Sequence, residues 1–538
     1  MPTTNESTPF DVFIKSTKED LDSDQVFRGL LDHGLFSEKI PPCFTTVGLA
    51  DFIKNTRYSL LDESDERKLK KIIDECSHDY IRYEALRETN IPRHLGIPHP
   101  EAYAAQTLSI VKFWEEITTL CNKPKPQFSR IHVRNLGGGK IFEMNYKGRE
   151  KYQFEEEEIE WMSGVKYIVE ADIASCFPSI YTHSIPWALN GKKNAKKLNS
   201  IVAFSGNLID KCTQNTKDRQ TNGILIGPHA SSIISEIILT RVDCDLQSKG
   251  YKKINRHIDD YRFYASSYDE AEKFLKDLGM FLRQYEMSLN DKKTKILSLP
   301  RPSVENWIQC LNRFAFPKNE VINFSLIRAF LDLALDCSLA IGKSTPLNYA
   351  LKTLKGNQNN PKNLNLRAKR LYVQEAMNLA IAYPYLAPVL DKSVFEIYWY
   401  EGLSDKIKDF SISLVRLGIR KVYPDAIAHA LYYALKYNFV LDELGDNALL
   451  EIITLEDCIA NVLLYEYACK NKNKKLKSAI KKYGEEMKKS ESRDRDKNWL
   501  LIFQLWTEKE LDGCDQNFLA DLKRKKFEFL SFKSFETA

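Results

Sequence analysis

The sequence predicts an α+β domain followed by an all-α domain, and three observations lead to this fold class. Between residues 165 and 300, short β-rich runs alternate with segments of helical periodicity. Past Pro302 the strand patterns fade, and long helical patterns separated by short polar breaks take over. The chain has 538 residues, which exceeds the size of one ordinary core, so two or three domains are expected.

Composition excludes several classes of protein. Hydrophobic residues make up 43% and charged residues 28% of the chain, which is typical of a globular protein. No run approaches the roughly 18 apolar residues of a membrane span, and the N-terminus lacks the apolar core of a secretion signal. Eleven cysteines occur without a Cys-x-x-Cys pair, so neither a zinc cluster nor a disulfide framework is indicated. We therefore expect a cytoplasmic protein with no membrane partner, whose net charge of +5 permits a nucleic-acid partner without demanding one.

The N-terminal part of the chain offers weaker patterns. Residues 1–60 form a polar lead-in that contains Pro41 and Pro42, and we expect this segment to pack against the domain that follows. Residues 64–88 carry sparse apolar positions in a charged background, which predicts a surface helix. Residues 104–121 repeat apolar side chains at intervals of three, which predicts one amphipathic helix.

The central part of the chain predicts a sheet with acidic residues at one end. The apolar run 165–171 predicts a strand that ends at Asp172, and we expect extended chain to continue through residues 173–177. The run 254–265 predicts a hairpin with Asp259 and Asp260 at its tip.

Helical patterns complete this region. One helix is predicted after Gly227, where Ile233, Ile234, Ile237 and Ile238 form an apolar stripe, and a second is predicted over residues 269–285. The resulting order is strand, helix, hairpin, helix and strand. This order predicts an antiparallel sheet with helices packed on one face.

Carboxylates at these positions match the chemistry of nucleotide addition. Joining a 3′-hydroxyl to an α-phosphate commonly uses two divalent ions about 3.5–4 Å apart. Mg²⁺ takes oxygen ligands and keeps several waters, so two or three carboxylates from separate strands suffice. An isolated Asp-Asp pair is more often a solvated turn, and the neighbouring residues must decide between the two interpretations.

Those neighbours resemble the reverse transcriptases. The segment Asp172–Phe177 is similar to their first palm motif, and His257–Asp260 is similar to their Tyr-x-Asp-Asp signature with histidine in the first position. The segment Gln220–Ser231 resembles the glycine-rich turn and helix beneath the template, and Leu289–Lys295 resembles the motif that presents a lysine near the triphosphate. Four motifs in the family's order make the resemblance specific.

Two N-terminal segments narrow the resemblance. Residues 34–46 and 91–100 are similar to bacterial abortive-infection (AbiK-like) reverse transcriptases, which act in antiphage defence. This resemblance implies fingers and palm of reverse-transcriptase type followed by a HEAT-like helical-repeat domain. The domains expected are an N-terminal extension over 1–60, fingers and palm over 61–300, a thumb-like helical connector over 301–355 and an α-helical repeat domain over 356–538.

The resemblance also implies roles for individual residues. Asp172, Asp259 and the backbone carbonyl of Ile173 would hold Mg²⁺ or Mn²⁺, and Asp260 would support the site. Among the nucleotide-binding residues, Phe177 would exclude a 2′-hydroxyl, and Lys293 would neutralise the departing pyrophosphate. Gly227 would belong to the turn beneath the nucleotide.

The function implied is DNA synthesis from dNTPs in abortive infection, untemplated and primed by the protein itself. Leu225 and Ile226 stand where the family usually has Pro-Gln before the glycine, so a polar contact to the template is missing. The DNA product would be attached covalently, and a homo-oligomer is expected. Two alternatives stay open: an RNA-templated reverse transcriptase of a retron or mobile element, and a catalytically idle scaffold that senses nucleic acid.

Overall fold

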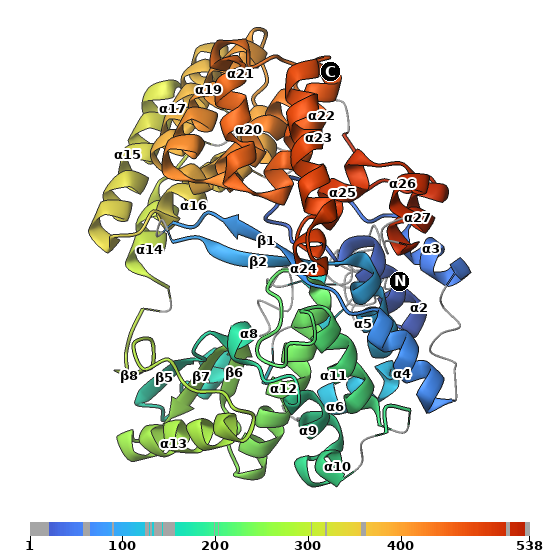
Figure 1. Ribbon diagram of the computed structural model, residues 1–538. Coiled ribbons are helices and arrows are strands. Elements are labelled where there is room, and N and C mark those ends of the chain that lie inside the picture. Colours follow the sequence, from blue (N-terminus) through green and yellow to red (C-terminus); the bar gives the residue numbers. More distant parts are fainter. Residues whose placement is uncertain are drawn as a thin grey trace, which may run out of the picture. The chain divides into compact units, whose positions relative to one another are not determined.

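The computed structural model describes residues 21–56, 65–88, 91–123, 128–129, 132–133, 142–143, 157–197, 200–202, 204–302, 304–317, 320–356, 362–512 and 517–532. The chain divides into two compact units (Figure 1). The first holds the described residues of Met1–Leu35, Thr46–Ser77 and Pro100–Leu299. The second holds those of Phe36–Thr45, His78–His99 and Pro300–Ala538, so it combines two N-terminal segments with the C-terminal half of the chain.

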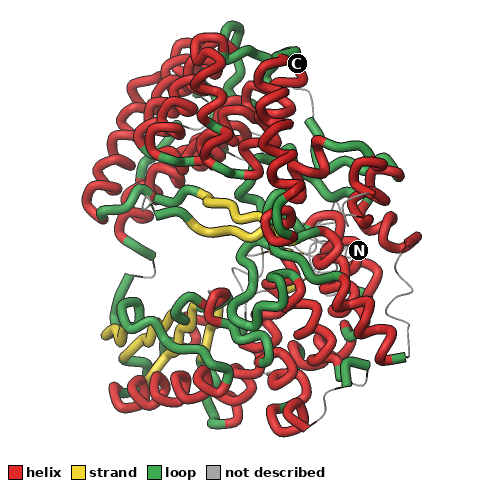
Figure 2. Tube along the Cα trace, in the orientation of Figure 1, coloured by secondary structure: helices red, strands yellow, loops and turns green. Residues whose placement is uncertain are grey.

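The first unit contains a four-stranded antiparallel sheet in the order β6-β7-β5-β8. Figure 2 shows its strands as yellow segments of the trace, with helices in red. Its strands are β5 (Tyr167–Asp172), β6 (Ile254–His257), β7 (Asp260–Ala265) and β8 (Lys295–Ser298). β5 lies in the centre, hydrogen-bonded to β7 on one side and to β8 on the other. In β7, Tyr261 and Phe263 are buried, because alternate side chains of a strand point to the same face. A separate two-stranded sheet pairs β3 (His132–Val133) with β4 (Phe142–Glu143).

Helices cover the sheet and build the rest of the first unit. They are α2 (Ser23–His33), α3 (Leu49–Thr56), α4 (Glu66–Glu75), α5 (Pro100–Lys112), α6 (Trp114–Cys121), α8 (Cys176–Ser179), α9 (Ser184–Asn190), α10 (Lys192–Lys197), α11 (Ser205–Asn215), α12 (His229–Ser248) and α13 (Tyr268–Gln284). α13 packs on β5 and β7 (Figure 1). The residues that it buries lie on one apolar face, which includes Phe274 and Leu278. The Ser267 side chain caps its first turn by accepting a hydrogen bond from the amide of Glu270. The predicted palm helices are therefore present, and the isoleucines of α12 are buried.

Three local expectations differ from the structure. The strand β5 ends at Asp172 and does not continue through residue 177, because Ser175 adopts a left-handed conformation with φ of 47° and a helical turn follows. The helix expected over 64–88 covers only Glu66–Glu75, and a strand follows it. The helix expected over 104–121 is two helices that meet at Phe113.

The second unit is an array of paired helices. They are α14 (Asn306–Arg313), α15 (Phe324–Ile341), α16 (Thr345–Lys355), α17 (Leu366–Ala382), α18 (Ala387–Leu390), α19 (Leu403–Lys421), α20 (Pro424–Lys436), α21 (Gly445–Glu451), α22 (Cys458–Lys470), α23 (Lys474–Lys489), α24 (Ser492–Asp496), α25 (Trp499–Leu505), α26 (Glu508–Asp512) and α27 (Asn517–Arg524), with single helical turns at Pro384–Leu386, Asp391–Phe395, Asp442–Leu444 and Ile453–Leu455.

These helices pack in two rows. One row runs through α15, α17 and α19, and the other through α20, α22 and α25. The two rows are joined where α19 packs on α20, while α16 packs on α15 at the end of the first row. Stacked helix pairs are the architecture of helical-repeat proteins. The HEAT-like type of repeat stays a prediction, as do the domain limits. None of the described helices is long and apolar enough to cross a membrane.

A hairpin from the N-terminal part of the chain completes the second unit. β1 (Tyr80–Ala85) pairs antiparallel with β2 (Arg93–Pro98), and β1 packs against α20 and α22. The hydroxyl of Tyr83 donates a 2.5 Å hydrogen bond to buried Asp425, whose other carboxylate oxygen accepts from the amide of Leu86 at 2.9 Å. Because these bonds are buried, they fix the hairpin to α20.

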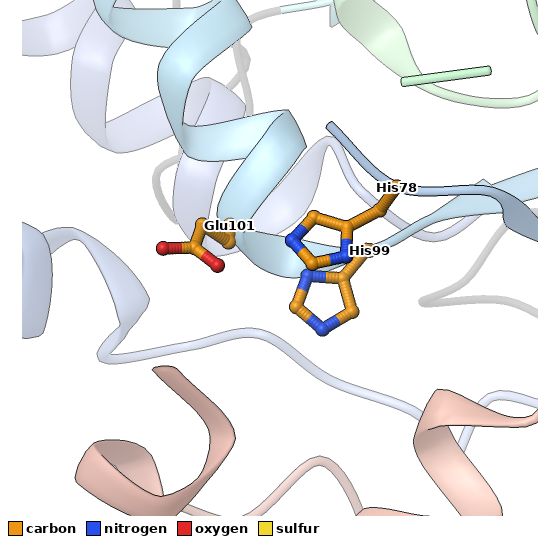
Figure 3. Close-up of side chains that lie close together, drawn as sticks. All are labelled: His78, His99 and Glu101. Carbon is orange, nitrogen blue, oxygen red and sulfur yellow. The ribbon is translucent and has the colours of Figure 1, made fainter. Parts of the chain in front are cut away.

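Stacked histidines lie at the ends of this hairpin. The rings of His78 and His99 are 3.8 Å apart and inclined by 21° (Figure 3). The His78 Nδ1 atom lies 3.3 Å from Asp496, and the amide of Asp79 donates to the same carboxylate. The lone pair of an imidazole nitrogen lies in the ring plane, and nearly parallel planes do not direct two lone pairs at one ion. The arrangement therefore favours a packing contact over a metal site.

The segment 36–45 also differs from expectation. It belongs to the second unit, where it pairs with residues near the C-terminus. The amide of Thr45 donates to the carbonyl of Phe529 at 2.9 Å, and the amide of Ser531 donates to the carbonyl of Cys43 at 2.8 Å. The expectation for residues 1–60 is therefore wrong for residues 36–45, because their hydrogen-bonding partners lie nearly five hundred residues away. The described residues on either side, including α2 and α3, belong to the first unit as expected.

Candidate active site

Three aspartates gather where the sheet of the first unit ends. Asp172 is the last residue of β5 and Asp260 the first of β7, and the two are direct cross-strand partners. The backbone carbonyl of Asp259 accepts a 3.2 Å hydrogen bond from the amide of Ile173. The four residues named for metal binding or its support therefore occupy one end of two paired strands. Their assignment as metal ligands stays a prediction.

A two-residue turn presents Asp259. His257 pairs with Asp260, so only Ile258 and Asp259 connect β6 to β7. Ile258 has φ of 56°, a left-handed conformation that is rare for a β-branched residue. Tight hairpins need positive φ in their turn, and glycine or asparagine usually supplies it. The turn that carries Asp259 is therefore strained, which is frequent at functional sites.

Asp172 is held by two neighbours. It is 8% exposed, and its Oδ1 atom accepts a 2.8 Å hydrogen bond from the side-chain amide of Asn290. Its Oδ2 atom accepts a 2.8 Å hydrogen bond from the ammonium of Lys293, which raises the pKa of Lys293. The side chain of Lys293 is 65% exposed, so its ammonium can leave Asp172 for another anion nearby at little cost.

Asp260 carries the perturbed carboxyl group of the site. The pKa of Asp260 is raised to about 6, first because the surrounding protein displaces water and then because Asp259 and Asp172 add negative charge. The ammonium of Lys293 opposes this shift without cancelling it. A cluster of carboxylates that resists its own ionisation in this way is suited to bind cations.

Phe177 and Gly227 lie on segments that are joined by backbone hydrogen bonds. Phe177 is half-buried in the short helix α8, and its carbonyl accepts a 2.9 Å hydrogen bond from the amide of Ile224. Three residues further on, Gly227 has φ of 126°, which side chains other than glycine rarely adopt. α12 begins directly after Pro228. The structure therefore brings the first motif and the glycine turn together, while their contacts with a nucleotide stay predictions.

Comparison with known proteins identifies the class of this domain. Residues 115–349 match the family model described as reverse transcriptase (RNA-dependent DNA polymerase). This range includes Asp172, Phe177, Gly227, the Asp259-Asp260 pair and Lys293. The chain therefore contains a reverse transcriptase domain within these residues. No curated protein matches the sequence.

Solved structures of telomerase are also similar to the chain. The truncated apo telomerase of Candida tropicalis is 13% identical, with 46% of this chain and 56% of that one covered and a TM-score of 0.26. The longer apo telomerase of the same organism is 11% identical, with 71% and 68% covered and a TM-score of 0.31. Telomerase of Candida albicans with a telomeric RNA fragment is 12% identical, with 79% and 66% covered and a TM-score of 0.29. The chain spans little more than half of the first of these, and likeness at this level carries no conclusion about function.

The residues at this end of the sheet fit a divalent cation. Reverse transcriptase domains use divalent metals such as Mg²⁺, and hard cations prefer carboxylate and carbonyl oxygens. Asp172, Asp259 and the carbonyl of Ile173 would hold the ion, and Asp260 would add negative charge beside it. A divalent ion bound there would lower the pKa of an attacking hydroxyl and offset phosphate charge.

Two residues that touch this site were not predicted. Asn290 fixes one oxygen of Asp172, and Arg256 donates a 3.1 Å hydrogen bond to the carbonyl of Ile258 in the hairpin turn. Asn290 lies within a motif that the sequence did single out. Arg256 is a charged residue on the buried face of β6, two positions after buried Ile254. A charged residue at a buried position of a strand is the feature of the sequence that could have identified it.

We expect metal binding to weaken as the pH falls through about 6. Below that pH Asp260 takes up a proton, which removes one negative charge from the cluster. Mn²⁺ titration followed by electron paramagnetic resonance between pH 5 and pH 8 should therefore give a dissociation constant that rises on acidification. Asp260→Asn should flatten this dependence, and an unchanged slope in that variant would contradict the assignment.

The raised pKa of Asp260 also lowers the stability of the metal-free folded protein as the pH rises. The folded-state pKa of Asp260 lies above its ordinary value of 3.8, so the unfolded chain loses the proton first. This group therefore disfavours folding increasingly as the pH rises from about 4 to about 6, and the effect is constant above that window.

Proposed function

We propose that the protein is a DNA polymerase that joins dNTPs with two-metal chemistry at the Asp172, Asp259 and Asp260 cluster. The observation that carries this proposal is the cross-strand pairing of Asp172 with Asp260 beside Asp259 within a reverse transcriptase domain. Phe177 would select deoxyribonucleotides by closing the space that a 2′-hydroxyl needs. The ammonium of Lys293 would leave Asp172 and pair with the phosphates of the nucleotide, where its charge would offset the negative charge that develops on pyrophosphate.

We further propose that synthesis is untemplated and primed by the protein itself, in defence against phage. Support comes from the resemblance of residues 34–46 and 91–100 to abortive-infection enzymes. It also comes from Leu225, which is 5% exposed and offers no side-chain amide beside the glycine turn. Mg²⁺ would be the cofactor, with Mn²⁺ as a substitute, and a homo-oligomer would be the working assembly.

Intact mass spectrometry tests this proposal. Purified protein incubated with Mg²⁺ and dNTPs, without primer or template, should gain mass in steps of one deoxynucleotide. The same incubation with ribonucleotides, or with the Asp259→Asn protein, should leave the mass unchanged. If DNA forms but stays free of the protein and its sequence matches a co-purified RNA, synthesis is templated and the proposal of self-priming is wrong.

A phage-challenge assay tests the role in defence. Cells that carry the Asp259→Asn variant should lose protection if synthesis is required. Undiminished protection by this variant, with the protein present at the wild-type level, would instead favour the idle scaffold that senses nucleic acid.

A further inference from the structure

Arg256 is a buried cation directly beneath the turn that carries Asp259. Its side chain is 0% exposed, and all five of its N–H groups donate hydrogen bonds. Nε and one N–H of Nη2 donate to Asp243 at 2.9 and 2.7 Å, and the other N–H of Nη2 and one of Nη1 donate to Glu236 at 2.8 and 2.9 Å. The remaining N–H of Nη1 donates to the carbonyl of Ile258 at 3.1 Å.

The two carboxylates come from one helix. Glu236 and Asp243 are seven residues apart on α12, so they lie two turns apart on the same face. Each planar carboxylate accepts two hydrogen bonds from the planar guanidinium. A lysine ammonium, which has three donors and no planar fork, cannot form this arrangement. Arg256 thereby ties the hairpin turn to the helix that follows the Gly227 turn.

The bond to Ile258 controls the direction of the Asp259 side chain. Two peptide groups flank the Cα atom of Asp259. The carbonyl of the first, that of Ile258, accepts from Arg256, and the carbonyl of the second accepts from the amide of Ile173 at 3.2 Å. Because both peptide planes are fixed, the Cα–Cβ bond of Asp259 has one direction. The same bond holds Ile258 at its strained φ of 56°.

We propose that Arg256 is a positioning residue, which holds the carboxylate of Asp259 at its place in the metal cluster through the backbone of Ile258. This inference rests on the proposed function, since it assigns Asp259 to that cluster. Arg256 is fully buried and reaches the site through the backbone of Ile258. Replacing Arg256 therefore changes the position of the Asp259 carboxylate, while all the proposed metal ligands remain present.

Arg256→Lys tests the inference, because it keeps the buried charge and removes the fork. We expect Mn²⁺ binding, measured by electron paramagnetic resonance, to weaken by about 10-fold, the lower end of the effect of residues that orient metal ligands. Hydrogen exchange of a peptide over residues 254–265 should quicken in the metal-free protein. Tyr251→Phe is the matched control, because it removes a 2.9 Å hydrogen bond to Asp277 beside the same sheet without reaching the turn. It should leave both measurements unchanged.

A rescue separates positioning from a general structural role. Asparagine tolerates the left-handed conformation, so Ile258→Asn in the Arg256→Lys background should recover most of the lost Mn²⁺ affinity. A folded Arg256→Lys protein with wild-type Mn²⁺ affinity and exchange would overturn the inference, as would the absence of rescue. If Arg256→Lys does not fold, Glu236→Gln is the alternative, because it weakens the hydrogen bonds that hold Arg256. It must then show weaker Mn²⁺ binding and faster hydrogen exchange, both by less than Arg256→Lys would. Should the wild type bind Mn²⁺ through Asp259 but incorporate no nucleotide, the proposed function fails while the positioning role stands.

Discussion

Replacing Asp259 with asparagine is expected to lower the rate of nucleotide incorporation by at least about 100-fold, which is the scale of removing one charge-stabilising group from an active site. Asparagine has the shape of aspartate but carries no charge, so the hairpin should keep its fold while the site loses affinity for a divalent cation. Incorporation of labelled dNTPs at saturating Mg²⁺ measures the effect.

The matched control is Asp269→Asn in the same unit. Asp269 is an exposed residue in the first turn of α13, and its replacement removes the same charge at a position outside the aspartate cluster. Both variants should melt at nearly the same temperature, and only Asp259→Asn should lose activity. If the Asp259→Asn protein incorporates nucleotides at the wild-type rate, the cluster of aspartates is not the active site.

Much of the first unit could be predicted because its signals are local. A strand that ends in an acid and a hairpin with two acids at its tip are patterns of neighbouring residues, and strand pairing then brings Asp172 next to Asp260. The helix over Tyr268–Gln284 follows from its apolar spacing and the Ser267 cap. The position of each of these elements along the chain agrees with the sequence analysis to within a few residues.

The remaining features depend on partners that are far apart in the sequence. The hairpin β1–β2 belongs to the second unit because Tyr83 bonds to Asp425, a residue 342 positions away. The residues of the stretch 64–88 do not indicate that Asp425 is a partner. The helix predicted for the whole stretch ends at Glu75, and a strand follows it. The contacts of Asn290 with Asp172 and of Arg256 with Ile258 likewise need the folded sheet before they exist.

The second unit contains a buried charged cluster centred on Asp391. Its side chain is 3% exposed and accepts hydrogen bonds from the ammonium of Lys436 at 2.8 and 2.9 Å. The hydroxyls of Tyr432 and Tyr437 also donate to it, at 2.9 and 2.6 Å. Burial and the charge of Asp391 raise the pKa of both tyrosines, so both stay protonated donors. These four residues join the helical turn 391–395 to α20 and the residue that follows it.

Asp391→Ala should therefore destabilise the second unit by about 3 kcal/mol, since it leaves the nearly buried ammonium of Lys436 without its main partner. The figure is the low end of the range for such a loss because Glu396 still pairs with Lys436 at 2.5 Å. Urea unfolding followed by tryptophan fluorescence should give a lower midpoint for one transition. Asp442→Ala, which removes the exposed partner of Lys408, should leave that midpoint unchanged, since exposed pairs contribute little. Equal midpoints for Asp391→Ala and wild type would mean that the cluster does not stabilise the array.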